Sequence, residues 1–253
     1  MKGEHMTGGE PQKIAVIPGD GIGPEVTAVG VQVLEAAAER FDLPLDFVWF
    51  DLGAEKYLAE GVTLPDETFA AFRDDYAAIY LAALGDPRVP DMVHARDILL
   101  GLRFRLDLYI NLRPVKLMHP SLTPLRDKGP ADLDLVIFRE NTEGLYADVG
   151  GRFKRGTPDE IAITEMIATR KGVERIIRAA YAYAEQHGKR RLCMSDKSNA
   201  IRHAHGLWQD VFRAVAAEHP NIESRHLYAD VMAMELVRAP EDFDVVVTSN
   251  LLN

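Results

Sequence analysis

Short apolar stretches alternate with amphipathic helical stretches along most of this 253-residue chain. The sequence predicts a strand at residues 13–18, a helix from Pro24 to about Phe41, and another strand at residues 45–50. Pro24 suits the first turn of a helix, where its missing N–H is not needed. Strand, helix and strand in this order are typical of an α/β fold with a largely parallel sheet.

The alternation resumes after a proline-rich loop at residues 119–130. We expect further strands at 133–138, 191–194, 223–228 and 244–248, and helices near 173–188 and 207–215. The segment near residue 100 is rich in arginine and interrupts the pattern. The length of 253 residues allows one large domain or two moderate ones. We place a domain boundary in the arginine-rich segment because the pattern changes there.

Composition narrows the classes of partner. The formal net charge of −10 disfavours binding to the phosphate backbone of nucleic acids. No apolar run approaches the ~18 residues of a membrane span, and residues 1–11 look like a disordered leader without a secretory pattern. Cys193 is the one cysteine, which excludes an intramolecular disulfide. We therefore expect a cytoplasmic protein that binds neither nucleic acid nor membrane. A small anionic substrate is still allowed, because a local cluster of arginines can override the global charge.

A glycine-rich loop at residues 19–23 joins the first strand to the first helix. Its glycines are spaced G-x-G-x-G, whereas a dinucleotide-binding loop is spaced G-x-G-x-x-G. The spacing therefore favours a tight turn over a cofactor loop.

Three arginines lie in otherwise apolar segments: Arg103, Arg113 and Arg139. A buried guanidinium group must be paired, and its fork matches a carboxylate in bidentate geometry. Three such groups near one cleft would bind a di- or tricarboxylate. The alternative is that each arginine pairs with an internal acid such as Asp107 or Glu140.

Polar side chains also follow directly after three predicted strands, where α/β proteins often place their active sites. Tyr146 follows the strand at 133–138 and is a candidate general acid or a packing residue. Lys197 follows the next strand and is a candidate base or a solvated loop residue. Asp230 stands between a strand and a helix, where it is a candidate helix cap or a ligand of Mg²⁺ or Mn²⁺.

Taken together and in this order, five segments resemble the isocitrate/isopropylmalate dehydrogenase family. They are I-P-G-D-G-I-G-P-E (17–25), L-R-x-R-L-D-L-Y-x-N-L-R-P-V-K (102–116), F-R-E-N-T-E-G-L-Y (138–146), D-K-S-N (196–199) and Y-A-D-V-M-A-M (228–234). Each segment alone is a weak signal, but five in the family's order cover nearly the whole chain.

The resemblance implies the family's two-domain α/β fold, which is not a Rossmann fold. Residues 12–105 would form part of the first domain, residues 106–245 an inserted substrate and dimerisation domain, and residues 246–253 the start of a return to the first domain. Two subunits would dimerise through the inserted domain and share their active sites.

The resemblance also implies roles for individual residues. The substrate's malate-like carboxylates would be held by Arg103, Arg113 and Arg139. Asp230 would bind Mg²⁺ or Mn²⁺ at the dimer interface, and Lys197 of the other subunit would act as base. Tyr146 would protonate the enolate that remains after loss of CO₂. The substrate's hydride would pass to NAD, with NADP as the alternative cofactor.

The residues before Arg103 bear on the choice of acid. Isocitrate enzymes show S-x-N where this chain has Asp97 and Leu99, so a third carboxylate would be repelled by one and find no donor at the other. Leu99 and Leu100 match the paired leucines that accept an isopropyl group. This pattern favours 3-isopropylmalate, and hence leucine biosynthesis. Arg96 stands where such enzymes usually have Glu, which leaves tartrate and D-malate open.

In the family, the sequence after N-L-L-N supplies two more metal carboxylates and most of the nucleotide pocket. We therefore expect these 253 residues to form an incomplete dehydrogenase. The alternative is a non-catalytic regulatory subunit or a truncated binding fragment of the same fold.

Overall fold

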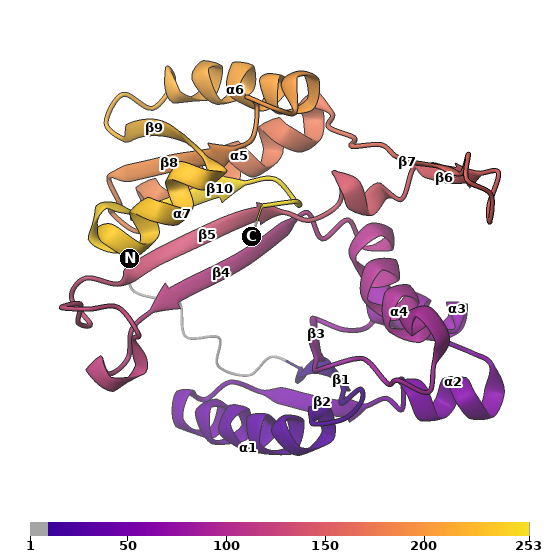
Figure 1. Cartoon of the computed structure of the whole chain (residues 1–253). Coiled ribbons are helices and arrows are strands. Elements are labelled where there is room, and N and C mark those ends of the chain that lie inside the picture. The colour runs from indigo at the N-terminus through magenta and orange to yellow at the C-terminus, as the bar shows by residue number, and fades with distance from the viewer. Residues whose placement is uncertain (1–9, 253) are drawn as a thin grey trace. The chain divides into compact units, whose positions relative to one another are not determined.

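The computed structural model describes residues 10–252 and divides into two compact units, Met1–Leu106 and Asp107–Asn253 (Figure 1). Most of the leader expected at residues 1–11 lies outside the described residues. Both units combine parallel sheet with helices, which confirms the predicted α/β class. None of the helices within residues 10–252 is long and apolar enough to cross a bilayer.

Unit 1 is built on a three-stranded parallel sheet of order β2-β1-β3. The strands are β1 (Gln12–Ile17), β2 (Leu45–Trp49) and β3 (Ala78–Leu81). The helices are α1 (Gly23–Phe41), α2 (Ala54–Glu60), α3 (Asp66–Asp74) and α4 (Val93–Arg105), and the 3₁₀ turn η1 (Pro90–Met92) precedes α4. The strands and the first helix predicted here agree with the structure to within a few residues.

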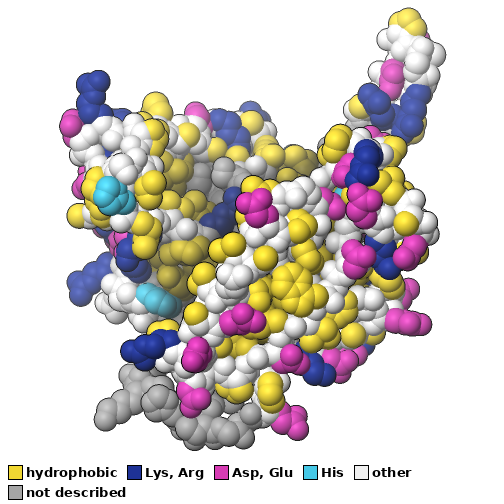
Figure 2. Space-filling model, turned by 90° about the horizontal axis from the view of Figure 1, so that it is seen from below, with side chains coloured by type: hydrophobic (Ala, Val, Ile, Leu, Met, Phe, Trp, Pro, Cys, Tyr) yellow, Lys and Arg dark blue, Asp and Glu magenta, His cyan; other side chains and the backbone are white. Residues whose placement is uncertain are grey.

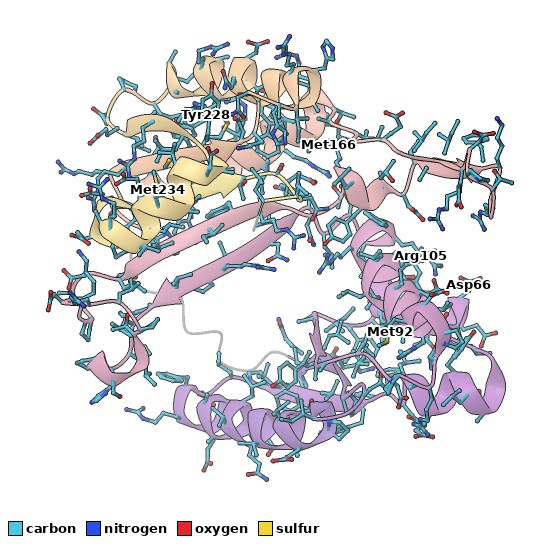
Figure 3. All side chains as sticks on the ribbon, in the orientation of Figure 1. Asp66, Met92, Arg105, Met166, Tyr228 and Met234 are labelled. Carbon is cyan, nitrogen blue, oxygen red and sulfur yellow. The ribbon has the colours of Figure 1, made fainter. Side chains whose placement is uncertain are left out.

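Helix α4 was not predicted from the sequence. Its apolar residues Ile98, Leu99, Leu100 and Leu102 are almost consecutive, so they give a weak helical period. In the structure Ile98 and Leu102 enter the unit 1 core with Phe69 and Phe72 of α3. The guanidinium group of Arg105 lies over the Phe69 ring, 3.7 Å from its centroid, and donates to Asp66 Oδ1 at 2.7 Å (Figure 3). These contacts fix the C-terminal end of α4 on α3.

Unit 2 contains a five-stranded sheet of order β4-β5-β10-β8-β9. Its strands are β4 (Ile110–Lys116), β5 (Asp134–Glu140), β8 (Arg191–Asp196), β9 (Glu223–Tyr228) and β10 (Val245–Thr248). Strand β4 is antiparallel to β5, whereas all the other pairs are parallel. The 3₁₀ turns η2 (Pro120–Leu122) and η4 (Pro240–Asp242) lie in the connections.

Helices cover both faces of this sheet. Helices α5 (Arg170–Gln186) and α6 (Arg202–Ala216) pack on the face that carries Phe138, Met194 and Val247. Helix α7 (Ala229–Arg238) packs on the opposite face, where its Met232 meets Cys193 (Figure 1). Because side chains alternate along a strand, the three inner strands β5, β10 and β8 carry buried apolar residues on both faces.

Strand β10 is the central strand of the unit 2 sheet. Its four residues are buried between β5 and β8. Residues 246–248, expected at the start of a return to the first domain, therefore lie within unit 2. The domain boundaries of the whole protein stay a prediction.

A β-hairpin extends from unit 2 after the 3₁₀ turn η3 (Leu145–Ala147) (Figure 1). It consists of β6 (Gly150–Phe153) and β7 (Ile161–Thr164), and every residue of both strands is exposed. Phe153, Ile161 and Ile163 are among these exposed residues.

Candidate active site

Buried polar side chains gather where the parallel strands of unit 2 end. The strand register places Thr248 of β10 beside Arg139 of β5 and beside Ser195 of β8. Thr248 Oγ1 donates to the Ser195 carbonyl oxygen at 2.9 Å. In open α/β sheets the ligand site usually lies outside the carboxyl ends of the strands. This edge is therefore the candidate site of unit 2.

The two candidate substrate-binding arginines of unit 2 are on the same face of the sheet as α7. Arg113 of β4 is opposite Ile137, which packs against the α7-side cluster, and Asn111 is opposite Arg139. A cavity of about 340 Å³ lies between α7 and this face, with Ser195 and Thr248 among its lining residues.

Arg139 is 5% exposed and is held by backbone. Its Nη2 and Nε atoms donate to the carbonyl oxygen of Asn250 at 2.8 and 3.2 Å. The alternative that it pairs with Glu140 is wrong, because that carboxylate accepts the backbone N–H groups of Thr142 and Glu143, each at 2.8 Å. In the described part of the chain, no carboxylate pairs with Arg139.

Arg113 is half-buried, and its Nε donates to Asn111 Oδ1 at 2.9 Å. The alternative that Asp107 neutralises it is also wrong. Asp107 instead pairs with Arg175 at 2.7 Å, and this hydrogen bond lowers the pKa of Asp107. The side chains of Arg113 and Arg139 are thus oriented by neutral groups, which leaves their charge available to an anionic ligand.

Tyr146 lies in the η3 turn and is 43% exposed. Its ring is close to Arg139, whose guanidinium carbon is 5.5 Å from the ring centroid. Gly144 begins this turn with a φ of +81°, a conformation that L side chains rarely adopt. The exposure of the ring argues against the alternative that Tyr146 is a packing residue.

Lys197 and Asp230 meet at the ends of β8 and β9. Lys197 Nζ lies 2.6 Å from Asp230 Oδ1, and this hydrogen bond lowers the pKa of Asp230. Asp230 stands in the first turn of α7, whereas the N-cap position is Tyr228, whose side chain makes no capping hydrogen bond. The Asp230 carboxylate therefore bonds to a lysine rather than capping the helix.

The remaining predicted residues are in unit 1, on α4. Arg96, Leu99, Leu100 and Arg103 are spaced to lie on one side of the helix, away from the buried Ile98 and Leu102. All four are exposed or half-buried. The α4 face thus combines two leucine side chains with two guanidinium groups.

The glycine-rich loop of unit 1 is a packed junction, as the tight-turn prediction implies. Gly19 has a φ of +68°, and a Cβ atom there would lie 2.1 Å from the Ala83 carbonyl oxygen. The buried Asp20 carboxylate accepts the N–H groups of Ala54 and Gly85 at 2.6 and 2.8 Å and contacts His94 at 2.8 Å. Asp20 and His94 were not singled out from the sequence, because the contact that joins them spans 74 positions.

The residues present supply only part of a metal site. A carboxylate such as Asp230 is a suitable ligand for Mg²⁺ or Mn²⁺. Within residues 10–252, however, no group of three or more His, Cys, Asp or Glu side chains is arranged to hold a metal ion. Asp230 is therefore a candidate for one ligand, and the described residues alone do not fit a complete site.

Comparison with known proteins extends over nearly the whole chain. Residues 13–252 match the isocitrate/isopropylmalate dehydrogenase family. The 3-isopropylmalate dehydrogenase of Thermobifida fusca is 47% identical over 239 residues, which are 94% of this chain and 67% of that protein. The 3-isopropylmalate dehydrogenase of Streptomyces avermitilis is 44% identical over the same shares. The chain thus spans about two thirds of the length of these relatives.

Solved structures agree with this match. The crystal structure of isocitrate dehydrogenase from Methylococcus capsulatus superposes with a TM-score of 0.83 at 33% identity, covering 95% of this chain and 67% of that one. The TT0538 protein from Thermus thermophilus gives a TM-score of 0.81 at 34% identity, covering 95% of this chain and 46% of that one. By sequence and by fold, the chain belongs to the isocitrate/isopropylmalate dehydrogenase family.

Proposed function

We propose that this chain is the substrate-binding part of a metal-dependent, decarboxylating dehydrogenase that oxidises 3-isopropylmalate with NAD. NADP remains the alternative cofactor. The observation that carries the proposal is one sheet edge that combines Arg113 and Arg139, free of carboxylate partners in the described residues, with the Lys197–Asp230 pair. The relatives named 3-isopropylmalate dehydrogenase support the choice of acid.

Binding of the acid is assigned to the arginines. Arg113 and Arg139 present guanidinium groups whose orientation is already fixed by Asn111 and by the Asn250 carbonyl oxygen. A carboxylate that meets them makes charge-assisted hydrogen bonds without reorganising the protein. Arg103 of α4 is the third proposed carboxylate ligand.

Proton transfer is assigned to Tyr146 and, because the active sites of the proposed homodimer are shared, to Lys197 of the partner subunit. In its neutral form, Lys197 takes the proton of the substrate hydroxyl group while the C2 hydride leaves. After the carbon–carbon bond to the departing carboxylate breaks and CO₂ leaves, Tyr146 donates its hydroxyl proton to the enolate carbon. When bound, the nicotinamide would accept the hydride and the divalent cation would polarise the oxo group. Asp230 is proposed as one ligand of that cation.

The choice among malate-type acids is assigned to α4. Leu99 and Leu100 offer apolar surface to an isopropyl group, whereas a third carboxylate would find no donor on them. Asp97, which accepts a hydrogen bond from Thr63 Oγ1 at 3.4 Å, adds a negative charge on the same helix. Isocitrate, tartrate and D-malate are therefore the weaker candidates.

A homodimer with shared active sites is proposed as the working form. Two exposed apolar regions of unit 2 support an interface between copies of the chain: the β6–β7 hairpin and the outer side of α7, where Met234 and Val237 are 55% and 61% exposed (Figure 3). On the face shown in Figure 2, acidic side chains are scattered among hydrophobic and basic ones. Neither nucleic acid nor a membrane is a proposed partner, and the cytoplasm is the proposed compartment.

A comparison of acids tests the proposal. The natural protein that carries this chain would be assayed for reduction of NAD⁺ and NADP⁺ with Mg²⁺ and with 3-isopropylmalate, D-malate, tartrate or isocitrate. We expect the largest kcat/KM with 3-isopropylmalate and NAD⁺. Oxidation of none of the four acids would instead favour a non-catalytic regulatory subunit or binding fragment, which the incomplete set of metal ligands in the described residues also suits.

A further inference from the structure

A buried histidine of α6 contacts the loop that carries Lys197. His205 is 0% exposed, and its Nδ1 lies 2.7 Å from the backbone nitrogen of Lys197. Because a backbone N–H only donates, Nδ1 must accept, and the neutral ring then carries its proton on Nε2. Burial lowers the pKa of His205, which favours this neutral form.

The Nε2 side of the His205 ring indicates that the hydrogen bond to Lys197 has a specific role. The Nε2 atom of His205 is buried and has no hydrogen-bond partner in the described part of the chain. A buried N–H without an acceptor destabilises a fold. If this position were purely structural, an apolar side chain would suit it better than histidine. The hydrogen bond to Lys197 is the contact that an apolar side chain could not make.

The rest of the loop is held by separate hydrogen bonds. Asp196 Oδ1 accepts both the backbone N–H and the Oγ hydroxyl of Ser198, each at 2.9 Å. Gln209 of α6 donates to Ser198 Oγ at 2.5 Å, and His226 Nε2 is 3.0 Å from Asp196 Oδ1. The Lys197 carbonyl oxygen accepts the N–H groups of Ala200 and Ile201 at 3.0 and 2.8 Å. Loss of the His205 bond would therefore free the backbone N–H of Lys197, on the strand side of the residue, while the turn that follows stays in place.

We infer that His205 is a positioning residue for the reaction. By accepting a hydrogen bond from the backbone N–H of Lys197, it fixes the backbone position from which the Lys197 side chain extends. This inference rests on the proposed role of Lys197 as base. A lysine side chain is long and flexible, so the position of its Nζ near Asp230 depends on a fixed backbone. A displacement of about 1 Å at a reacting group can lower a rate by about a hundredfold.

Three substitutions of His205 distinguish the effect of losing the hydrogen-bond acceptor from the effect of changing the volume of the side chain. His205→Leu keeps an apolar volume without an acceptor, and His205→Gln keeps an amide but places it near the position of Nε2. His205→Asn places its Oδ1 near the position of Nδ1 and so retains the acceptor. His203→Asn, at an exposed position of the same helix, is the matched control.

We expect His205→Leu and His205→Gln to lower kcat for 3-isopropylmalate by roughly 10- to 100-fold, with KM changed by less than about threefold. His205→Asn is expected to restore most of the lost kcat, and His203→Asn to leave it unchanged. Amide hydrogen exchange at Lys197 is expected to be slow in the wild type and in His205→Asn, and faster in the other two variants.

Several results would overturn the inference. One is wild-type kcat in folded His205→Leu or His205→Gln; another is equal impairment of all three variants. Unchanged exchange at Lys197 in folded His205→Leu or His205→Gln would overturn it independently of activity. Should His205→Leu not fold, His205→Gln provides the same comparison. Failure of the proposed function is recognised separately, by a wild type that oxidises none of the acids or by a Lys197→Ala variant that keeps full activity.

Discussion

At the residue scale, the candidate site depends on Arg113 and Arg139, because the nearby carboxylates that could neutralise them bond to other groups. Glu140 accepts backbone N–H groups and Asp107 pairs with Arg175, so neither neutralises Arg113 or Arg139. The sequence singled out both arginines because they stand among apolar residues. Their orienting partners are the Asn111 side chain and a carbonyl oxygen 111 positions away from Arg139, and no local pattern predicts such a contact.

Arg139→Lys is expected to lower kcat/KM for 3-isopropylmalate by about 10- to 100-fold, because one ammonium group cannot both bond the Asn250 carbonyl oxygen and present a fork to a carboxylate. The measurement is steady-state kinetics together with thermal unfolding. Arg126→Lys, at an exposed position of the loop at residues 119–130, is the control and should change neither quantity. Unchanged kcat/KM in folded Arg139→Lys would remove Arg139 from substrate binding.

At the element scale, two features place the site: the order of strands in unit 2 and the amphipathic character of α4. Strand β9 was predicted with the bounds it has in the structure, and Pro220 and Asn221 mark the turn before it. Helices α2 and α4 were missed, because α2 is only 7 residues long and the apolar residues of α4 are almost consecutive. The ends of strands were therefore easier to predict than the helix that is proposed to select the substrate.

Leu99→Ala on α4 is expected to lower kcat/KM for 3-isopropylmalate by roughly 10- to 200-fold. The kcat/KM for D-malate should change much less, because D-malate has no isopropyl group that could contact Leu99. The ratio of the two kcat/KM values is the measurement. Leu58→Ala, at an exposed position of α2, is a matched control that should leave the ratio unchanged. An equal loss for both acids would show that Leu99 has no part in selecting the isopropyl group.

Asp244 joins the start of β10 to the start of β8. Its Oδ2 atom accepts the backbone N–H groups of Arg190 and Arg191 at 3.1 and 3.0 Å, and Oδ1 pairs with Arg191 Nη2 at 2.8 Å. Burial alone would raise the pKa of Asp244, but these hydrogen bonds outweigh it and lower the pKa. The ionised carboxylate therefore stabilises the fold above the ordinary aspartate pKa of about 3.9, and this stability is lost as the pH falls below that value.

Asp244→Asn is expected to lower the free energy of unfolding by about 1–3 kcal/mol at pH 7. It is also expected to flatten the loss of stability of the wild type between about pH 5 and pH 2.5. Denaturant unfolding across this range is the measurement. Asp242→Asn is the control, because its carboxylate is more exposed and 3.8 Å from Arg191, and it should have a smaller effect. Equal pH profiles for wild type and Asp244→Asn would contradict the assignment.

At the scale of the whole molecule, the family and its α/β fold could be predicted from five segments, because these occur in the family's order and extend over nearly the whole chain. The strand pairing that brings Arg139, Thr248 and Ser195 into line joins segments more than 50 residues apart. The exposed apolar side chains of α7 became visible only once the helix was placed on the sheet, since its buried Met232 and its exposed Met234 are two positions apart. Packing, rather than composition, decides which of them is free for a partner.

Met234→Glu is expected to weaken the proposed homodimer at least tenfold in Kd, because it places a charge on a side chain that would be desolvated in the interface. Sedimentation velocity over a range of concentrations measures this shift toward monomer. Met118→Glu, at an exposed methionine outside α7 and the β6–β7 hairpin, is the control. A wild-type protein that is monomeric at every concentration would contradict the dimer itself.

The proposed chemistry is tested most directly by its stoichiometry. The natural protein would be supplied with 3-isopropylmalate, NAD⁺ and Mg²⁺, and the NADH and CO₂ formed would be measured together. Oxidative decarboxylation predicts one CO₂ for each NADH, and Lys197→Ala should reduce both products in parallel. NADH without CO₂, or neither product from a folded preparation, would contradict the assignment of this chain to a decarboxylating 3-isopropylmalate dehydrogenase.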